Sequence, residues 1–338
     1  MRNFRPWPPE IARGIIGAMS LPSMPLERLE AARARVVDAV HRTPILPSRT
    51  LSERVGATVL LKCENLQKTG AFKVRGALHR LLTLSEEERA RGVCTISAGN
   101  HAQAVAWAAS AAGVSSVVVM PEHASPTKVR ASREYGAEVI LHGDAAAAFV
   151  RVREISEERG LTFVHPFDDE EVVAGHASCG LEILEDAPDA GTIVVPVGGG
   201  GLSSAIAAAV AAKGGGVDVW GVEPEGAAAM HRSLAEGRAV HLDSVSTVAD
   251  GLAPPMAGEI NHALLAEHAA GVVLVDDEEI LDAQRLLLER TKLLVEPSGA
   301  AGLAALLAGR IPIRSGTPVV VVLSGGNADL HRLGASLR

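Results

Sequence analysis

The sequence predicts an α/β fold with two three-layer αβα domains, each built around a parallel sheet. Short apolar segments rich in valine and isoleucine alternate with longer Ala- and Leu-rich helical segments along most of the chain. The 338 residues are enough for about two domains of ordinary size. Because 47% of the residues are hydrophobic and only 3% are aromatic, the core must consist of aliphatic side chains, which suits buried strands covered by helices.

The first half of the chain is expected to start with helices and a strand and then to alternate regularly. Ser85 and Glu88 have the spacing of a capping box, which starts a short helix that stops at Gly92. The expected elements are helices 25–40 and 47–55, strand 58–61, a helix from residue 77, helix 85–92, strand 93–96, helix 102–112, strand 116–120, helix 126–135, strand 138–141, helix 145–159 and strand 163–164. The three strand–helix units from residue 93 onward predict one parallel three-layer unit.

A second alternating series follows. The segment 192–197 is apolar throughout, as expected of a strand that helices cover on both faces. The expected elements are helix 175–184, strand 192–197, helix 202–213, strand 217–222, helix 224–236, strand 272–275, helices 277–294 and 299–307, and strand 318–323.

Charge and cysteine content exclude several classes of protein. The net charge of −8 argues against a surface for nucleic acid or anionic membranes. No segment approaches the roughly 18 apolar residues that span a bilayer. The three cysteines are widely spaced and form no CxxC pair, which favours small buried thiols in a cytoplasmic protein over disulfides or zinc. Residues 1–24 are interpreted as an extension before the compact fold and not as a targeting signal.

Four consecutive glycines, Gly198, Gly199, Gly200 and Gly201, stand between a buried strand and a helix. Without Cβ atoms their backbone N–H groups can approach an anion closely, and the helix N-terminus favours negative charge. A Walker loop would need Lys and Ser or Thr after the glycines, which this chain lacks. A dinucleotide loop remains as an alternative: Gly198, Gly200 and Ser203 match its pattern partly, with Glu223 at the next strand.

Polar residues follow two other strands. Ser97, Ala98, Gly99, Asn100 and His101 precede the Ala-rich helix, where backbone and side-chain donors are suited to a substrate carboxylate or to simple helix capping. Ser324 ends the last strand, at the edge of the sheet where ligands bind in such folds. Glu296 precedes a helix and is a candidate cap or active-site acid.

Lys73 lies directly after Phe72, between Gly70 and Gly76. A lysine there is either solvated or held in a pocket, where burial makes its amine a nucleophile. Pyridoxal phosphate needs such a lysine, a phosphate loop, a partner for its ring nitrogen and a carboxylate clamp. One hypothesis therefore uses all four motifs; a nucleotide-dependent oxidoreductase and a non-catalytic binder of small molecules are the alternatives.

The segments 61–73, 97–103, 198–201 and 324–327 agree in order and spacing with a known family. The chain resembles, over 25–330, the fold-type II pyridoxal-phosphate enzymes of the threonine dehydratase and serine racemase group, which share the tryptophan synthase β fold. The resemblance implies a large cofactor-binding domain of residues 25–84 and 167–338 and a small substrate-side domain of residues 85–166. It also implies a homodimer or higher homo-oligomer.

The resemblance also assigns roles. Lys73 would hold the cofactor and move the substrate α-proton, Phe72 would pack near the ring, and Asn100 would donate to the ring's 3-oxygen. The four glycines would bind the phosphate, and Ser324 the ring nitrogen. The implied reaction removes water from an L-3-hydroxy amino acid such as threonine or serine and yields a 2-oxo acid and ammonia. Phenylserine, 3-hydroxyaspartate and hydroxyectoine-derived substrates are alternatives within the same group.

Several positions depart from the family pattern. Racemases of the group have a second serine where this chain has Ala98, so dehydration without efficient racemisation is expected. Glu223 matches one acidic metal ligand of the family, but Ala229 stands at the second position, so no bound metal is expected. Ala71 replaces a common serine. The sequence shows no isoleucine-sensing domain after Asn327, so no inhibition by isoleucine is expected.

Overall fold

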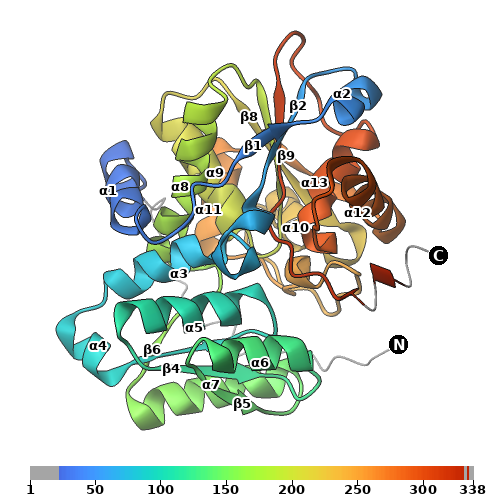
Figure 1. Cartoon of the computed structure of the whole chain (residues 1–338). Helices are drawn as coiled ribbons and strands as arrows, with labels where there is room; N and C mark the ends of the chain where they lie inside the picture. Colours follow the sequence, from blue (N-terminus) through green and yellow to red (C-terminus); the bar gives the residue numbers. More distant parts are fainter. Residues whose placement is uncertain (1–22, 331–332, 335–338) are drawn as a thin grey trace.

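The computed structural model describes residues 23–330 and 333–334, so the extension predicted for 1–24 lies almost entirely outside the described residues. It contains two sheets (Figure 1). The larger has the strand order β1-β2-β10-β7-β8-β9, and the smaller has the order β5-β4-β3-β6. The strands of the large sheet are β1 (Ile45–Pro47), β2 (Val59–Lys62), β7 (Thr192–Pro196), β8 (Asp218–Pro224), β9 (Gly271–Val275) and β10 (Val319–Val322).

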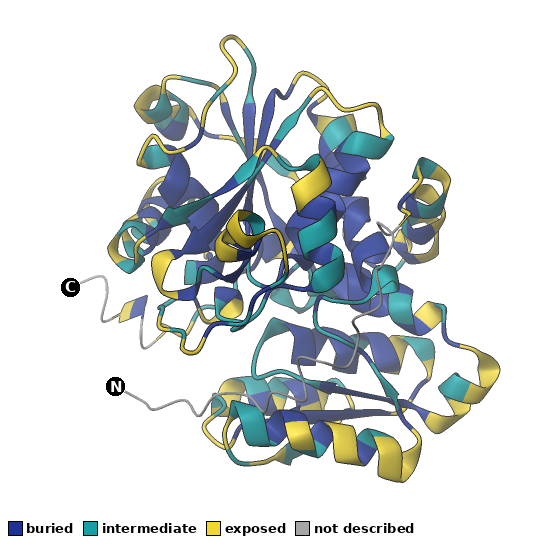
Figure 2. Ribbon diagram, turned by 180° about the vertical axis from the view of Figure 1, so that it is seen from behind, coloured by how far each residue is buried: buried dark blue, intermediate teal, exposed yellow. Residues whose placement is uncertain are grey.

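Helices cover both faces of the large sheet because the side chains of its strands alternate between two apolar clusters. Val319 and Val321 of β10 pack with α2, α12 and α13, whereas Val320 and Val322 pack with α8 to α11. In Figure 2 these strands and the inner helix faces are buried. The helices are α1 (Leu26–Val36), α2 (Arg49–Val55), α8 (Glu170–Asp186), α9 (Gly201–Ala212), α10 (Ala229–Glu236), α11 (Glu259–His268), α12 (Asp277–Thr291) and α13 (Pro297–Leu307).

The small sheet is parallel throughout, as predicted. Helices α5 and α6 cover one face and α7 the other. The elements of this unit are α4 (Glu86–Arg91), β3 (Val93–Ile96), α5 (Asn100–Ala112), β4 (Ser116–Met120), α6 (Pro126–Glu134), β5 (Glu138–Leu141), α7 (Ala145–Arg159) and β6 (Thr162–Phe163). Helix α3 (Lys73–Leu82) lies between the two units, where it packs with α1, α5 and α8 (Figure 1).

The α/β class and the three-layer arrangement are confirmed, with three corrections. The large sheet is not entirely parallel, because the short edge strand β1 pairs antiparallel with β2. Helix α8 starts five residues before the predicted Gly175, since Asp169 caps it by accepting from the Glu171 and Val172 amides. The predicted helix 224–236 is a 3₁₀ turn (Glu225–Ala227) followed by α10, and α11 was not predicted.

The described part of the chain has no helix that is long and apolar enough to cross a membrane. Cys63, Cys94 and Cys179 are all free and buried, as predicted. Burial raises the pKa of the Cys63 and Cys94 thiols to about 12 and about 11. These thiols therefore pack as small apolar groups.

Candidate active site

Lys73 is the first residue of α3, and the segment that follows β10 holds the backbone that precedes it. The Phe72 amide donates to the carbonyl of Ser324 (3.1 Å), and the Gly326 amide donates to the carbonyl of Gly70 (2.8 Å). Gly70 has φ +73°, and a Cβ on it would lie 2.5 Å from Oδ1 of Asn327, so the contact requires glycine. The loop before Lys73 is thus joined to the segment that follows β10, more than 250 residues later in the chain.

The Lys73 amine is enclosed without an acidic partner. Its Nζ donates to the carbonyl of Pro166 (2.7 Å) and lies 5.0 Å from the centre of the Phe72 ring. Within the described residues no carboxylate pairs with it, and burial lowers the pKa of Lys73 to about 8 from its ordinary value of 10.5. The neutral fraction of this amine near physiological pH is therefore far larger than that of an ordinary lysine, and the neutral form is what nucleophilic attack on an aldehyde requires.

Three histidines lie near this amine: His101 and His176 are buried, and His165 is half-buried. Burial, together with the nearby positive charge of Lys73, lowers the pKa of His101, His165 and His176, that of His165 to about 3. These rings are therefore neutral at physiological pH and supply no counter-charge. The ring of His165 accepts two hydrogen bonds at Nδ1, from the amides of Phe167 and Asp168, which leaves its proton on Nε2.

The four glycines connect β7 to α9 at the carboxyl end of the large sheet. Gly200 has φ +97° and caps α9, and a Cβ on Gly199 would overlap the ring of Phe167 at 2.4 Å. The buried carbonyl of Gly199 is bound by the Gly258 amide and by Nδ2 of Asn261. In contrast, the amides of residues 198–200 meet no acceptor among the described residues. Buried N–H groups at a helix N-terminus without protein acceptors are the donor set that a phosphate requires.

Ser324 lies at the carboxyl end of β10, next to β7 in the sheet. Its side chain is buried, and its hydroxyl has no hydrogen-bond partner within the described chain. Gly325 is held by the Glu296 amide, which donates to its carbonyl at 3.0 Å. Ser324 therefore presents an unused donor and acceptor at the edge where the glycine loop and Lys73 also lie.

The loop before α5 brings the predicted carboxylate clamp to the same region. Helix α5 starts at Asn100, two residues earlier than predicted, so Gly99 is its N-cap. The Ser97 hydroxyl accepts from the Gly99 amide at 3.0 Å and shapes the loop. The ring of His101 faces the interior, where Nε2 lies 3.3 Å from the carbonyl of Val164. Side chains 97–100 are partly exposed, so this segment can meet a small anionic ligand.

Asn100 contacts two residues from the large unit. Its Nδ2 donates to Oε1 of Glu296 at 2.6 Å, and its Oδ1 accepts from Nδ2 of Asn327 at 2.9 Å. Glu296 is buried, which raises its pKa, while the Lys128 ammonium and the Asn100 hydrogen bond act in the opposite direction. Glu296 thus lies at the predicted site, where it binds Asn100 directly.

Glu223 lies apart from these groups, at the end of β8. Its two carboxylate oxygens accept from the backbone amides of Met230 and His231 (2.8 and 2.7 Å), so it caps α10. Burial raises the pKa of Glu223 to about 8 against the effect of these amides. The described residues contain no cluster of three or more His, Cys, Asp or Glu side chains able to hold a metal ion.

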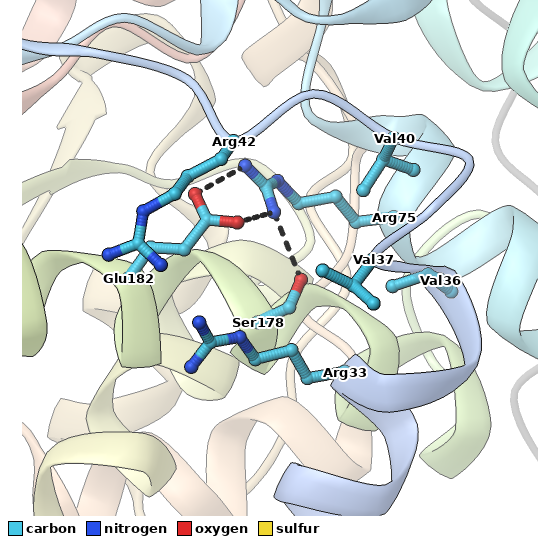
Figure 3. A pocket seen from close by; sticks show the side chains of 8 residues that line it. All are labelled: Arg33, Val36, Val37, Val40, Arg42, Arg75, Ser178 and Glu182. Carbon is cyan, nitrogen blue, oxygen red and sulfur yellow. Dashed lines mark hydrogen bonds and ion pairs between the residues drawn. The ribbon is translucent and has the colours of Figure 1, made fainter.

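A buried ionic cluster lies on the other side of the start of α3, and the small cavity beside it is drawn in Figure 3. Arg75 donates to both oxygens of Glu182 (2.7 and 2.8 Å) and to both oxygens of Glu64 (2.8 Å each). Lys62 also donates to Glu182, at 2.6 Å. Arg33 and Arg42 line the cavity in Figure 3. Sequence patterns did not single out this cluster, because its members Lys62, Glu64, Arg75 and Glu182 come from three separate segments.

Sequence reasoning also missed the segment around Pro166 and Phe167. The Pro166 carbonyl binds Lys73, and the Phe167 ring packs against the glycine loop. Asp168 accepts from the amides of Glu259 and Ile260 and so fixes the start of α11. The only signal in the sequence was the pattern His-Pro-Phe-Asp-Asp after a short strand, which resembles an ordinary turn.

Comparison with known proteins agrees with this geometry. Residues 36–325 match the family model of the pyridoxal-phosphate dependent enzymes. The chain is 44% identical over 309 residues to an L-threonine ammonia-lyase of Thermotoga maritima, which covers 91% of this chain and 77% of the relative. It is 41% identical over 304 residues to a phenylserine dehydratase of Ralstonia pickettii (90% and 93% covered). The structure of maize serine racemase superposes with a TM-score of 0.89 at 36% identity, covering 94% of this chain and 97% of that one.

The chain therefore belongs to the pyridoxal-phosphate dependent enzymes. The predicted family resemblance, the tryptophan synthase β-like fold, the cofactor and the enzyme class, a pyridoxal-phosphate dependent ammonia-lyase, are confirmed. The oxidoreductase alternative, which interpreted the glycines as a dinucleotide loop, is wrong.

Proposed function

We propose that the chain removes water and then ammonia from an L-3-hydroxy amino acid, with L-threonine as the first candidate substrate. The observation that supports it most strongly is Lys73, an enclosed amine that donates to the Pro166 carbonyl and has no acidic partner among the described residues. The similarity to a threonine ammonia-lyase and to a phenylserine dehydratase points to the same reaction on different side chains.

The residues present fit pyridoxal phosphate. The unsatisfied amides of 198–200 and the start of α9 suit the phosphate, and the Ser324 hydroxyl suits the ring nitrogen. Asn100 retains one Nδ2 hydrogen for the ring's 3-oxygen, because the other is donated to Glu296. Phe72 packs beside the Lys73 amine and would contact the ring.

When bound, the cofactor withdraws electrons from the substrate Cα, which acidifies the α-proton. Lys73 holds the cofactor before substrate arrives, and its amine then takes that proton. A pKa near 8 suits this exchange, since the amine accepts and releases a proton at physiological pH. The N–H groups of residues 97–100 orient the substrate carboxylate. Ala98 has no acid–base group, so no residue at that position serves as a base on the opposite face.

Phenylserine is the second candidate substrate, favoured by the relative that acts on it according to its name. 3-Hydroxyaspartate and hydroxyectoine-derived amino acids remain further candidates. The Ala145–Phe149 segment gives no reason to expect a substrate with a large side chain. Ala148 and Phe149 are buried in the core of the small unit.

Release of ammonia and of the matching 2-oxo acid from L-threonine, L-serine, L-phenylserine and L-3-hydroxyaspartate tests the proposal. We expect turnover of L-threonine, with little D-serine formed from L-serine and no loss of activity in EDTA. If the purified holoenzyme turned over none of these amino acids, the proposal would fail. D-Serine formed at a rate comparable to pyruvate would contradict the role given to Ala98.

The domain boundaries, the cellular location and the oligomeric state of the protein are also proposals. We retain the division into a cofactor-binding domain (25–84 and 167–338) and a small domain (85–166), which agrees with the separation of the two sheets. A cytoplasmic location is supported by the three free, buried thiols. A homodimer or higher homo-oligomer, and the absence of a metal at Glu223, are expected from the sequence resemblance and from the capping role of that carboxylate.

A further inference from the structure

Asn100 is held from both sides by residues that are distant in sequence. Its partners are Glu296, which precedes α13, and Asn327, which follows β10, whereas Asn100 itself starts α5 beside the small sheet. These three side chains therefore join the substrate-side unit to the large unit at the proposed active site.

The hydrogen bonds fix the direction of each carboxamide. Nδ2 of Asn327 donates to the backbone carbonyl of Thr69 at 2.7 Å, and a carbonyl can only accept. The same Nδ2 donates to Asn100, so the Asn100 atom at that contact must be its oxygen. The Asn100 nitrogen must then point toward Glu296, where Oε1 accepts at 2.6 Å. The reverse orientation would place two amide nitrogens against each other and an oxygen against a carboxyl oxygen.

The backbone around Glu296 leaves its carboxyl group little freedom. A Cβ on Gly325 would lie 2.3 Å from Oε1 of Glu296 and 3.1 Å from Nδ2 of Asn100. The Glu296 amide donates to the Gly325 carbonyl, which fixes the residue beside Ser324. The carboxyl group is thus packed against the same loop that carries the proposed partner of the ring nitrogen.

We propose that Glu296 is a positioning residue that holds the Asn100 carboxamide with its remaining Nδ2 hydrogen available to the 3-oxygen of the cofactor ring. This inference rests on the proposed function, since it assigns Asn100 to the cofactor. Glu296 then acts through Asn100 and not as an acid that touches substrate. Asn327 secures the other end of the carboxamide in the same way.

The first test is a double-mutant cycle between Glu296→Leu and Asn100→Ala, with Glu278→Gln as the control. Glu278 is an exposed carboxylate on α12 without a hydrogen-bond partner among the described residues. We measure the Kd for pyridoxal phosphate, the pH dependence of the visible absorption band of the bound cofactor, and kcat. Glu296→Leu alone should weaken cofactor binding or lower kcat by about tenfold to a hundredfold, the range of one hydrogen bond to a charged group.

Because Glu296 acts through Asn100, adding Glu296→Leu to the Asn100→Ala variant should change the Kd for the cofactor and kcat by less than about a further threefold. It should also shift the pH profile of the absorption band, and a purely structural residue would not do this. Glu278→Gln should match the wild type. If the two effects multiply, or if the pH profile of Glu296→Leu is unchanged, the positioning role is refuted.

A conservative variant covers the case in which Glu296→Leu does not fold. Glu296→Gln keeps an oxygen acceptor at nearly the same volume, so it should retain the wild-type pH profile with a loss of less than about tenfold. A Glu296→Gln profile displaced as far as that of Asn100→Ala would refute the inference. If wild-type enzyme shows neither the absorption band nor ammonia release, the proposed function fails instead.

Discussion

Two cationic regions lie on α3 and the strand before it, and they differ in whether the cation has carboxylate partners. Lys62 and Arg75 are fully buried with two carboxylates, Glu64 and Glu182, each within 2.6–2.8 Å of a cationic nitrogen. Lys73 is enclosed two residues before Arg75, but its amine donates to the Pro166 carbonyl and pairs with no carboxylate among the described residues. Although burial opposes the charge of Arg75, the Glu64 carboxylate raises its pKa, whereas burial alone lowers the pKa of Lys73 to about 8.

Under the proposed function, one short segment supplies both a structural ion pair and the reactive amine. A buried cation with matched carboxylates stays charged and ties together distant segments, at a desolvation cost that the pairing offsets. A buried amine without such a partner is easily deprotonated and can react. Since Arg75 lies within the first turn of α3, the ionic cluster also anchors the helix on which Lys73 lies. Variants at Lys73 and at Arg75 separate the two roles.

Replacing Lys73 should have the largest effect on activity and should not destabilise the apoprotein. Lys73→Met removes the proposed proton-transfer group, so kcat for ammonia release should fall about 10⁴-fold or more. The apoprotein should be at least as stable as the wild type, because the variant no longer buries an amine without an acidic partner. Thermal unfolding of both apoproteins checks this, and a large drop in unfolding temperature would mean that Lys73 is structural.

Replacing Arg75, in contrast, should lower the stability of the protein. Arg75→Met leaves Glu64 and Glu182 buried with Lys62 as the remaining cation, so the free energy of unfolding should fall by about 3–5 kcal/mol. Urea denaturation measures it. Arg49→Met, which removes an exposed pair with Glu53, should cost less than about 1 kcal/mol and serves as the control. A loss at Arg75 no larger than that at Arg49 would contradict the structural role of the cluster.

The smallest effect concerns pH. The pKa of Lys73 is about 8 in the folded apoprotein and near 10.5 when unfolded, so the unfolded chain binds more protons between these values. The free energy of unfolding of the wild type, relative to Lys73→Met, should therefore rise with pH from 8 to 10.5, by up to about 3 kcal/mol. Urea curves of the two apoproteins at several pH values check the sign. A difference that stays constant or falls over this range would show that the amine is not desolvated.

Local signals in the sequence were enough to predict most helices and strands and to single out the four segments proposed to form the site. The capping box at Ser85 is present as predicted, and α5 ends at the predicted residue, Ala112, where the left-handed Gly113 follows it. Helix α11 was missed because its first turn is held by Asp168, 91 residues away in the chain. The early start of α8 was missed because its first residues, Glu170 and Glu171, are polar and resemble a loop.

Contacts between distant segments were beyond the reach of sequence patterns. The sequence left Glu296 as a cap or an acid, and only the folded chain places it against Asn100. The pairing of Arg75 with Glu182 joins α3 to α8, and neither position has a periodicity that distinguishes it from a surface charge. Such pairs depend on the packing of whole helices, which a local pattern does not encode.

The most direct test of the central claim is to locate the lysine that holds the cofactor. Holoenzyme is reduced with borohydride to make the lysine–cofactor link permanent, digested, and mapped by mass spectrometry. We predict a pyridoxyl phosphate group on Lys73 in stoichiometric amount, and none on Lys62 or Lys68. Modification of Lys62 or Lys68 in place of Lys73, or stoichiometric modification of Lys73→Met at another lysine, would contradict the claim that Lys73 is the reactive amine of this enzyme.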